Sequence, residues 1–309
     1  MKNTLSRREL LKLAGYSGMA ATLPFAHFLK QNKTMLKRRI LSSADEMLPV
    51  VGLGTWIQFD VGKSEEDRQP LREVLKSMAE HGGKVIDSSP MYGNSEEVVG
   101  DLAAATGLAD KFFYATKVWT NGEKEGIAQM QASLRKMRRT TMDLMQIHNL
   151  MDWQTHLKTL KKWKEEGKIR YIGITHYTVS AHEQLEKIVK TEKIDFVQVN
   201  YSIRVRNAEN TLLKAAQDNG VSVIINEPFE KGSLFRDVKD KTLPDWAADY
   251  DIKSWAQFFL KFILSQPAVT CVIPGTSNPK HLADNMSAGF GKLPDAAGRK
   301  KMVEWIDKL

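Results

Sequence analysis

Short apolar runs alternate with amphipathic helical patterns through most of this sequence, and this alternation restricts the chain to few folds. Runs rich in Val, Ile and Leu are typical of strands buried on both faces, and parallel strands need an intervening helix. Eight such units in about 250 residues favour closure into a barrel. The predicted strands are 50–53, 85–87, 112–117, 143–148, 171–174, 196–199, 221–225 and 270–273, and the predicted helices are 64–80, 94–105, 124–138, 153–166, 180–190, 208–219 and 253–265.

An open, doubly wound sheet is the alternative fold, and it should carry a Gly-rich fingerprint after its first strand. The run G-L-G-T-W-I at 52–57 lacks the pattern G-x-G-x-x-G. We therefore predict an α/β protein with a (β/α)8 TIM barrel. An N-terminal β-hairpin near 39–48 and a C-terminal helix at 295–309 complete the predicted fold.

The positive charge of the chain is concentrated at its N-terminus. The formal net charge is +8, which would suit a nucleic-acid or anionic-membrane partner if it covered the folded body. Residues 1–39, however, hold nine of the 45 Lys and Arg and one of the 37 acidic residues, so the remainder is neutral. We therefore predict no nucleic-acid partner.

The first residues resemble an export signal. The run S-R-R-E-L-L-K at 6–12 resembles a twin-arginine (Tat) signal, and the apolar region after it is too short for a confident membrane span. We therefore assign 1–37 to a Tat signal peptide with a basic linker and 38–309 to the barrel domain. This predicts the twin-arginine machinery as a partner and a periplasmic or exported protein, anchored if the leader stays uncleaved. A basic amphipathic N-terminus of a cytoplasmic protein is the alternative.

Cys271 is the only cysteine, which excludes an intramolecular disulfide and a cysteine-based zinc site. It falls in an apolar predicted strand, where a thiol usually belongs to the core. No other pattern in the sequence suggests metal ligands, so we predict no metal.

Four residues with acid–base chemistry lie at or just after consecutive predicted strands. Asp87 ends the second strand and Tyr92 follows it, while Lys117 ends the third and His148 ends the fourth. In a barrel these strand ends meet at one mouth. A nearby ammonium favours the phenolate and lowers a tyrosine pKa, a carboxylate orients the lysine, and a neutral imidazole orients a carbonyl. This set therefore predicts protonation of a carbonyl oxygen as hydride reaches the carbon.

Each of these residues also has a simpler interpretation. Asp87 and Lys117 could form a structural ion pair, although burying one is costly. His148 alone could be a hydrogen-bonded core residue, and Tyr92 alone could pack a loop. The combination at one mouth favours function.

From about Arg38 to its end, the sequence resembles the aldo-keto reductase family. The resemblance rests on P-V-V-G-L-G-T-W, V-I-D-S-S-P-M-Y-G-N-S-E, T-K-V-W, L-M-Q-I-H-N, I-R-Y-I-G-I-T, F-V-Q-V-N-Y-S and V-I-P-G-T-S-N-P, in that order. It implies that Tyr92 is the general acid/base and that Asp87, Lys117 and His148 complete a tetrad. It also implies a nicotinamide dinucleotide bound without a Rossmann domain.

The resemblance extends to the cofactor contacts, with departures. His176 stands where the family usually has Asn, and Asn226 stands where a tyrosine commonly stacks on the nicotinamide. His281 replaces the arginine often used for the 2′-phosphate, so NADPH is favoured over NADH only moderately. The implied cofactor residues are Gly54, Thr55, Trp56, Thr175, His176, Gln198, Asn226, Pro228, Phe229, Gly232, Ile273, Pro274, Gly275, Thr276, Ser277, His281, Asp284 and Asn285.

The implied substrate is a small-molecule carbonyl compound in a pocket lined by Trp56, Met91, Trp119 and Asn149. We predict an NAD(P)H-dependent oxidoreductase that reduces aldehydes or ketones to alcohols, acting as a monomer. A nicotinamide-binding sensor or partner module with slow turnover is the alternative. A lyase that uses Lys117 as a Schiff base is a third hypothesis.

Overall fold

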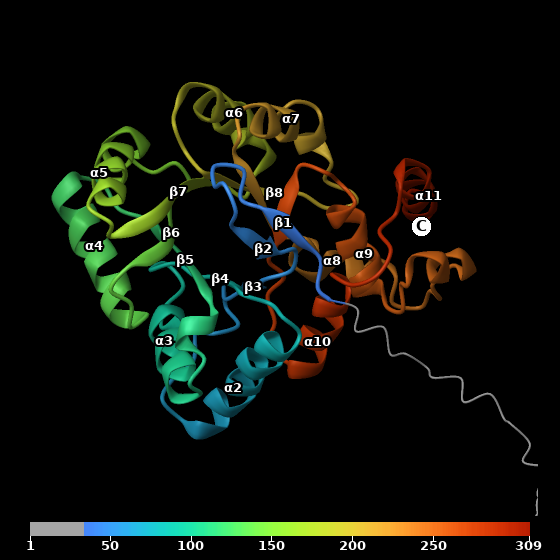
Figure 1. Cartoon of the computed structure of the whole chain (residues 1–309). Coiled ribbons are helices and arrows are strands. Elements are labelled where there is room, and N and C mark those ends of the chain that lie inside the picture. Colours follow the sequence, from blue (N-terminus) through green and yellow to red (C-terminus); the bar gives the residue numbers. More distant parts are fainter. Residues whose placement is uncertain (1–33) are drawn as a thin grey trace, which may run out of the picture. The chain divides into compact units, whose positions relative to one another are not determined.

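Eight parallel strands form the inner wall of the structure, a computed structural model that describes residues 34–309 (Figure 1). Each strand pairs with the next along the chain, and bridges from Val51 to Val272 and from Gly54 to Gly275 join the two ends of the sheet. The ring is closed, and the predicted TIM barrel is confirmed. The strands are β3 (Leu53–Gly54), β4 (Val85–Asp87), β5 (Phe113–Val118), β6 (Met142–His148), β7 (Ile169–Thr175), β8 (Phe196–Asn200), β9 (Ser222–Asn226) and β10 (Val269–Val272).

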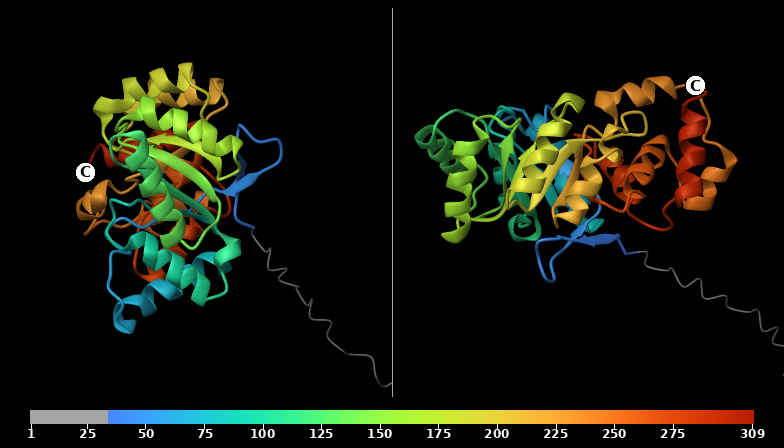
Figure 2. Two further views of the ribbon diagram at one scale, coloured as in Figure 1. Left: turned by 90° about the vertical axis from the view of Figure 1, so that its left-hand side faces the viewer. Right: turned by 90° about the horizontal axis from the view of Figure 1, so that it is seen from above.

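Helices surround this wall, as the views in Figures 1 and 2 show. The first long helix illustrates why they form: Ser64 caps its N-terminus by accepting a hydrogen bond from the backbone N–H of Asp67, and its buried side chains recur every three or four residues. The helices are α2 (Glu65–Glu80), α3 (Ser95–Ala105), α4 (Glu123–Lys136), α5 (Trp153–Glu165), α6 (His182–Thr191), α7 (Leu212–Asp218), α8 (Ser233–Asp237), α9 (Trp255–Leu264), α10 (Pro279–Ser287) and α11 (Ala296–Ile306).

A two-stranded hairpin, β1 (Lys37–Arg39) and β2 (Met47–Pro49), projects from one end of the barrel in both views of Figure 2. Ile40 and Leu48 of this hairpin share a buried cluster with interior residues of the barrel strands. The hairpin therefore closes the end of the barrel at which the strands begin, so that the opposite end carries the open mouth.

The folded body begins earlier than the sequence predicted. Met35 is buried, and Leu36 donates its backbone N–H to the carbonyl of Gly289 at 2.8 Å and accepts from the N–H of Val50 at 3.0 Å. The folded body therefore includes residues that the sequence assigned to the linker, Met35 and Leu36 among them. Most of the predicted leader, residues 1–33, lies outside the described residues.

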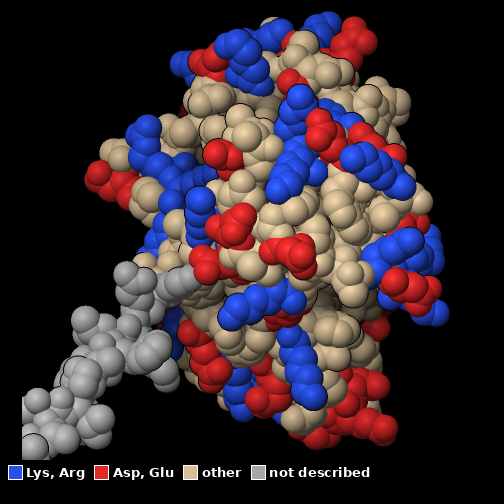
Figure 3. Space-filling model, turned by 90° about the vertical axis from the view of Figure 1, so that its right-hand side faces the viewer, with Lys and Arg blue, Asp and Glu red and all other residues tan. Residues whose placement is uncertain are grey.

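The folded body has a mixed surface. Lys and Arg alternate with Asp and Glu over the face seen in Figure 3, and no large area of one sign stands out there. Across residues 34–309, no helix combines the length and apolar composition needed to cross a bilayer.

Candidate active site

The interior of the barrel changes from apolar to polar along each strand. On β6, Leu144 belongs to the apolar interior cluster, whereas Met145 and Ile147 belong to the cluster that packs under the helices. Because side chains alternate between the two faces of a strand, Gln146 and His148 continue the interior row. Buried polar residues end the interior rows of other strands in the same way: Asp87 on β4, Lys117 on β5, Thr175 on β7 and Gln198 on β8.

Asp87 and Lys117 form a buried ion pair at the base of the mouth. The Nζ of Lys117 lies 2.6 Å from Oδ2 of Asp87 and 2.6 Å from the carbonyl oxygen of Ser88. Burial disfavours the charged lysine, but Asp87 and Tyr92 outweigh it, so the pKa of Lys117 is raised above its usual value. The pair is therefore charged and fixed in place.

Two buried amides hold the other oxygen of Asp87. Oδ1 accepts from Nε2 of Gln146 at 2.8 Å and from Nε2 of Gln198 at 2.9 Å. The Oε1 of Gln198 in turn accepts from Oγ1 of Thr175 at 3.1 Å. Gln146 was not predicted from the sequence, although a glutamine two residues before His148 in an apolar strand was a usable signal. These amides keep the carboxylate aligned with Lys117.

Tyr92 stands beside this pair on the loop between β4 and α3. The Nζ of Lys117 lies 4.9 Å from the centroid of its ring. Burial raises the pKa of Tyr92 above its ordinary value, and Lys117 offsets only part of that rise. The predicted net lowering of this pKa was therefore wrong, because desolvation outweighs the ammonium. At neutral pH the phenol keeps its proton and is an O–H donor.

His148 faces the same space from β6. Its ring packs edge-on against that of Tyr92, with 5.8 Å between the centroids. Burial, then the charge of Lys117 and the nearby His176, lowers the pKa of His148 to about 3. The imidazole is therefore neutral at physiological pH and suited to hydrogen-bond a carbonyl oxygen.

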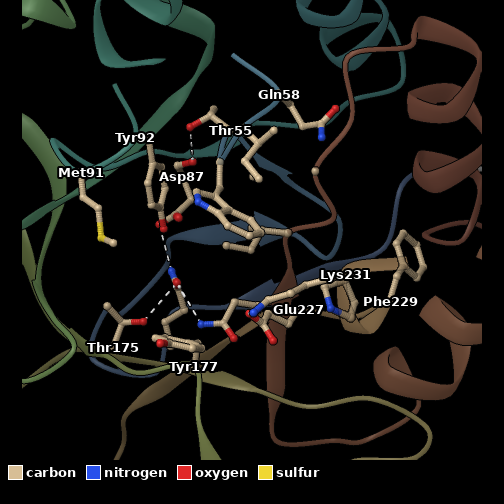
Figure 4. A pocket seen from close by; sticks show the side chains of 18 of the residues that line it. Thr55, Gln58, Asp87, Met91, Tyr92, Thr175, Tyr177, Glu227, Phe229 and Lys231 are labelled. Atoms are coloured by element: carbon tan, nitrogen blue, oxygen red, sulfur yellow. Dashed lines mark hydrogen bonds and ion pairs between the residues drawn. The ribbon is translucent and has the colours of Figure 1, made fainter. Parts of the chain in front are cut away.

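A cavity of about 580 Å³ opens above these residues, and Figure 4 shows Asp87, Tyr92, Met91 and Thr175 around it. His148 also lines it. The predicted cofactor and substrate residues that line it are Gly54, Thr55, Trp56, Met91, Asn149, Thr175, Gln198, Asn226, Pro228, Phe229, Gly232, Ile273 and Gly275. Lining residues absent from the predicted set are Ile57, Gln58, Tyr177, Glu227, Lys231 and Phe235.

Some predicted contacts lie outside this lining. Trp119 does not line the cavity, and its ring centroid lies 6.4 Å from that of His148. His176 uses Nδ1 to accept from the backbone N–H groups of Tyr177 and Thr178 and so shapes the loop after β7. The remaining predicted cofactor residues that do not line the cavity are Pro274, Thr276, Ser277, His281, Asp284 and Asn285, which lie between β10 and the end of α10.

Lys231 lies at the mouth, on the loop after β9. Its Nζ lies 3.4 Å from Oε1 of Glu227 and near the faces of two rings, 5.7 Å from the centroid of Trp56 and 5.4 Å from that of Tyr177. Figure 4 shows Lys231, Glu227 and Tyr177 grouped at one side of the cavity. Lys231 thus balances the negative charge of Glu227.

The backbone at this mouth is strained. Asn149, Glu227 and Lys231 have φ values of 53°, 48° and 54°, in the left-handed region that non-glycine residues rarely adopt. Such conformations gather at functional sites because the surrounding fold must hold them.

The residues of the cavity fit a nicotinamide carboxamide. In the described part of the chain, Oδ1 of Asn226 is buried without a hydrogen-bond partner, while its Nδ2 makes long contacts of 3.3 Å to Gln198 and 3.4 Å to the carbonyl of His176. An amide held this loosely can turn toward a ligand at little cost, and it offers the acceptor that a carboxamide N–H needs. Across residues 34–309, no three His, Cys, Asp or Glu side chains are grouped to hold a metal ion.

Comparison with known proteins agrees with this fold. Residues 50–299 match the model of the aldo/keto reductase family, so the chain belongs to that family. It is 28% identical over 259 residues to the methylglyoxal reductase YeaE of Escherichia coli (strain K12), covering 81% of this chain and 89% of that protein. It is 24% identical over 336 residues to an NADH-specific methylglyoxal reductase of the same organism, covering 88% of this chain and all of that protein.

A solved structure is also similar. The crystal structure of an aldo/keto reductase from Klebsiella pneumoniae in complex with NADP and acetate superposes with a TM-score of 0.72 at 25% identity. The match covers 84% of this chain and 92% of the other.

Proposed function

We propose that this chain is an NAD(P)H-dependent carbonyl reductase in which Tyr92 is the proton donor. The observation that carries the proposal is the arrangement of Tyr92 beside the Asp87–Lys117 pair, with neutral His148 on the same cavity. When bound, the cofactor supplies a hydride to the carbonyl carbon. Asp87 holds Lys117, Lys117 stabilises charge that develops on the phenol oxygen, and Tyr92 gives its proton to the carbonyl oxygen. His148 orients that oxygen, and the product is an alcohol.

The Tyr92→Phe variant tests this mechanism because it removes one O–H from the site. We expect the rate of carbonyl reduction to fall by about 10²- to 10⁴-fold, the contribution typical of a positioned general acid. Cofactor affinity is measured by quenching of protein fluorescence, and it should change by less than about threefold. That change is smaller than the one expected from losing a hydrogen bond to a charged group of the cofactor. An unchanged rate in Tyr92→Phe would exclude Tyr92 as the donor.

Methylglyoxal is the first substrate to test, because two relatives are named methylglyoxal reductases. We propose NADPH as the preferred cofactor, with NADH as the competitor. Lys280 and His281 stand in the first turn of α10. A helix N-terminus favours negative charge, and NADPH carries the additional negative charge of its 2′-phosphate. A ratio of kcat/KM for NADPH over NADH below one would contradict this preference.

A nicotinamide-binding sensor with slow turnover is the second candidate. Lys231, held between Trp56, Tyr177 and Glu227 at the mouth, would slow cofactor exchange. Tight NADPH binding without turnover of any aldehyde would favour this role. Rapid steady-state reduction would exclude it.

We also propose export of a monomer by the twin-arginine route with cofactor already bound. The proposal rests on the S-R-R-E-L-L-K run at 6–12 and on the ability of that route to carry folded proteins. Replacing both Arg7 and Arg8 by Lys should retain the protein in the cytoplasm. Protein from the native compartment should contain nicotinamide and should scatter light as a single chain, and a cytoplasmic wild-type protein would contradict the export.

A further inference from the structure

Ser89 contacts the imidazole of His148 through the ring nitrogen Nδ1. It lies two residues after Asp87, its side chain is fully buried, and its Oγ is 3.0 Å from Nδ1 of His148. The same Oγ accepts a hydrogen bond from the backbone N–H of Met91 at 3.2 Å. Ser89 therefore joins the loop that carries Tyr92 to the histidine on β6.

The other ring nitrogen of His148 faces the cavity. Among residues 34–309, Nε2 makes no hydrogen bond to the chain, and it is not one of the buried unpartnered atoms in that part of the protein. Because His148 lines the cavity, Nε2 is the nitrogen that a bound substrate meets.

The hydrogen bonds available to the Ser89 hydroxyl determine which ring nitrogen of His148 carries the proton. A hydroxyl has one proton to donate, and within the described residues Nδ1 of His148 is the acceptor that lies within reach of Oγ. If Nδ1 carried the proton, the buried hydroxyl would be left without an acceptor, which is unfavourable in the protein interior. The hydroxyl therefore donates to Nδ1, and a neutral ring then has its proton on Nε2.

We infer that Ser89 is a positioning residue that fixes the Nε2–H tautomer of His148. The ring then presents a hydrogen-bond donor, and not a lone pair, to the carbonyl oxygen that Tyr92 protonates. The opposite tautomer would place an acceptor against that oxygen and repel it. The effect on the substrate carbonyl rests on the proposed function. The tautomer itself is a property of the protein without substrate.

The tautomer is measured directly by long-range ¹H–¹⁵N correlation on the full chain labelled with ¹⁵N-histidine at pH 7. The chain has seven histidines, so the His148 signals are identified as those lost in His148→Gln. We expect wild-type His148 to give the Nε2–H pattern. An Nδ1–H pattern in the wild type would overturn the inference, whatever the Ser89 variants show.

Variants separate positioning from simple packing. Ser89→Ala should bring in a measurable share of the Nδ1–H form and lower kcat by about three- to tenfold, the value of one hydrogen bond, with little change in KM. Ser89→Thr keeps the hydroxyl and should restore both. Ser88→Ala is the matched control, because it removes an equally buried hydroxyl that bonds Thr55 instead of His148, and the tautomer should not change.

The outcomes distinguish this inference from the proposed function. A pure Nε2–H form in folded Ser89→Ala would overturn the positioning role, whatever the rate. The expected tautomers in a protein that reduces no carbonyl compound would contradict the proposed function and leave the role of Ser89 intact.

Discussion

At the scale of single residues, the site depends on the carboxylate of Asp87, both oxygens of which accept hydrogen bonds. Asp87 accepts from Lys117 on one oxygen and from Gln146 and Gln198 on the other. In a low-dielectric interior such bonds reinforce one another, and losing one leaves charge uncompensated. Gln198 is also fully engaged: its amide N–H groups go to Asp87 and Gln146, and its oxygen accepts from Thr175 and Asn226.

The Gln146→Leu variant tests how much this amide contributes. It keeps the side-chain volume roughly constant but removes one of the two donors to Oδ1 of Asp87. We expect the free energy of unfolding to fall by about 1–3 kcal/mol, the cost of leaving a buried acceptor less satisfied. We also expect a lower kcat, because Asp87 then orients Lys117 less firmly. Unfolding in urea and steady-state kinetics measure the two effects, and an equally stable variant would mean that Gln146 is dispensable.

At the scale of elements, the loop between β4 and α3 places Tyr92 by a tight turn. Gly93 has φ of +56°, and a Cβ built on it would lie 2.2 Å from Oδ1 of Asp60. That carboxylate accepts from the backbone N–H of Asn94 at 2.9 Å and so anchors the start of α3. A side chain after Tyr92 would therefore have to displace the carboxylate of Asp60.

Gly93→Ala should cost more than the backbone strain alone. Gly107 supplies the matched control, because it has φ of +68° and a Cβ added to it would meet nothing within 4 Å. Gly107→Ala should lower the free energy of unfolding by about 1–2 kcal/mol through the left-handed backbone. Gly93→Ala should lose more stability and also lose kcat, because Asp60 and the turn must move. Equal losses in the two variants would show that the contact with Asp60 is unimportant.

Elements with strong periodicity were predictable from the sequence, and short ones were not. The strands β4 to β10 stood out because nearly all of their positions are buried on both faces of the sheet and most of them are apolar. α8 has five residues and lies between the predicted strand 221–225 and the predicted helix 253–265. It was not predicted because a single turn is too short to show the 3.6-residue periodicity of apolar residues. The predicted helix 208–219 is divided, since Thr211 has φ of −144° and α7 begins at Leu212.

The residues of the site were also predictable only where local sequence identified them. The four tetrad positions were predicted because each lies at or just after a strand end, a feature of local sequence. Gln146 and Ser89 were not assigned, because their roles arise from contacts between strands or loops far apart in the chain. Trp119 was expected in the pocket but does not line the cavity, although its ring lies near that of His148.

At the scale of the whole molecule, the folded body includes residues that the sequence assigned to the linker. Met35 is 6% exposed and belongs to the main core, and Leu36 is hydrogen-bonded to both Gly289 and Val50. A chain that starts at Thr34 keeps these contacts, whereas a chain that starts at Arg38 loses them. We expect the shorter chain to be less stable by about 2–5 kcal/mol, the usual cost of losing a buried large apolar side chain. Urea unfolding of the two chains measures the difference, and equal midpoints would place the boundary at 38.

The buried His148 also ties global stability to pH. Its pKa is lowered from 6.5 to about 3 by burial and by the charge of Lys117, so the folded protein excludes a proton that the unfolded chain binds. A histidine with a depressed folded pKa contributes stability that is complete above the unfolded value and is lost as pH falls from 6.5 toward 3. Between about pH 7 and about pH 4.5 this loss is about 2–3 kcal/mol for one group.

Many carboxylates titrate over the same range, so the wild type must be compared with His148→Gln, which lacks this one group. The free energy of unfolding of the wild type should fall by about 2–3 kcal/mol more than that of the variant between the two pH values. Parallel pH profiles of the two proteins would mean that His148 is charged or solvated in the folded state. A charged ring would be a donor at both nitrogens, so the same measurement also tests whether the ring is neutral, as a single fixed tautomer requires.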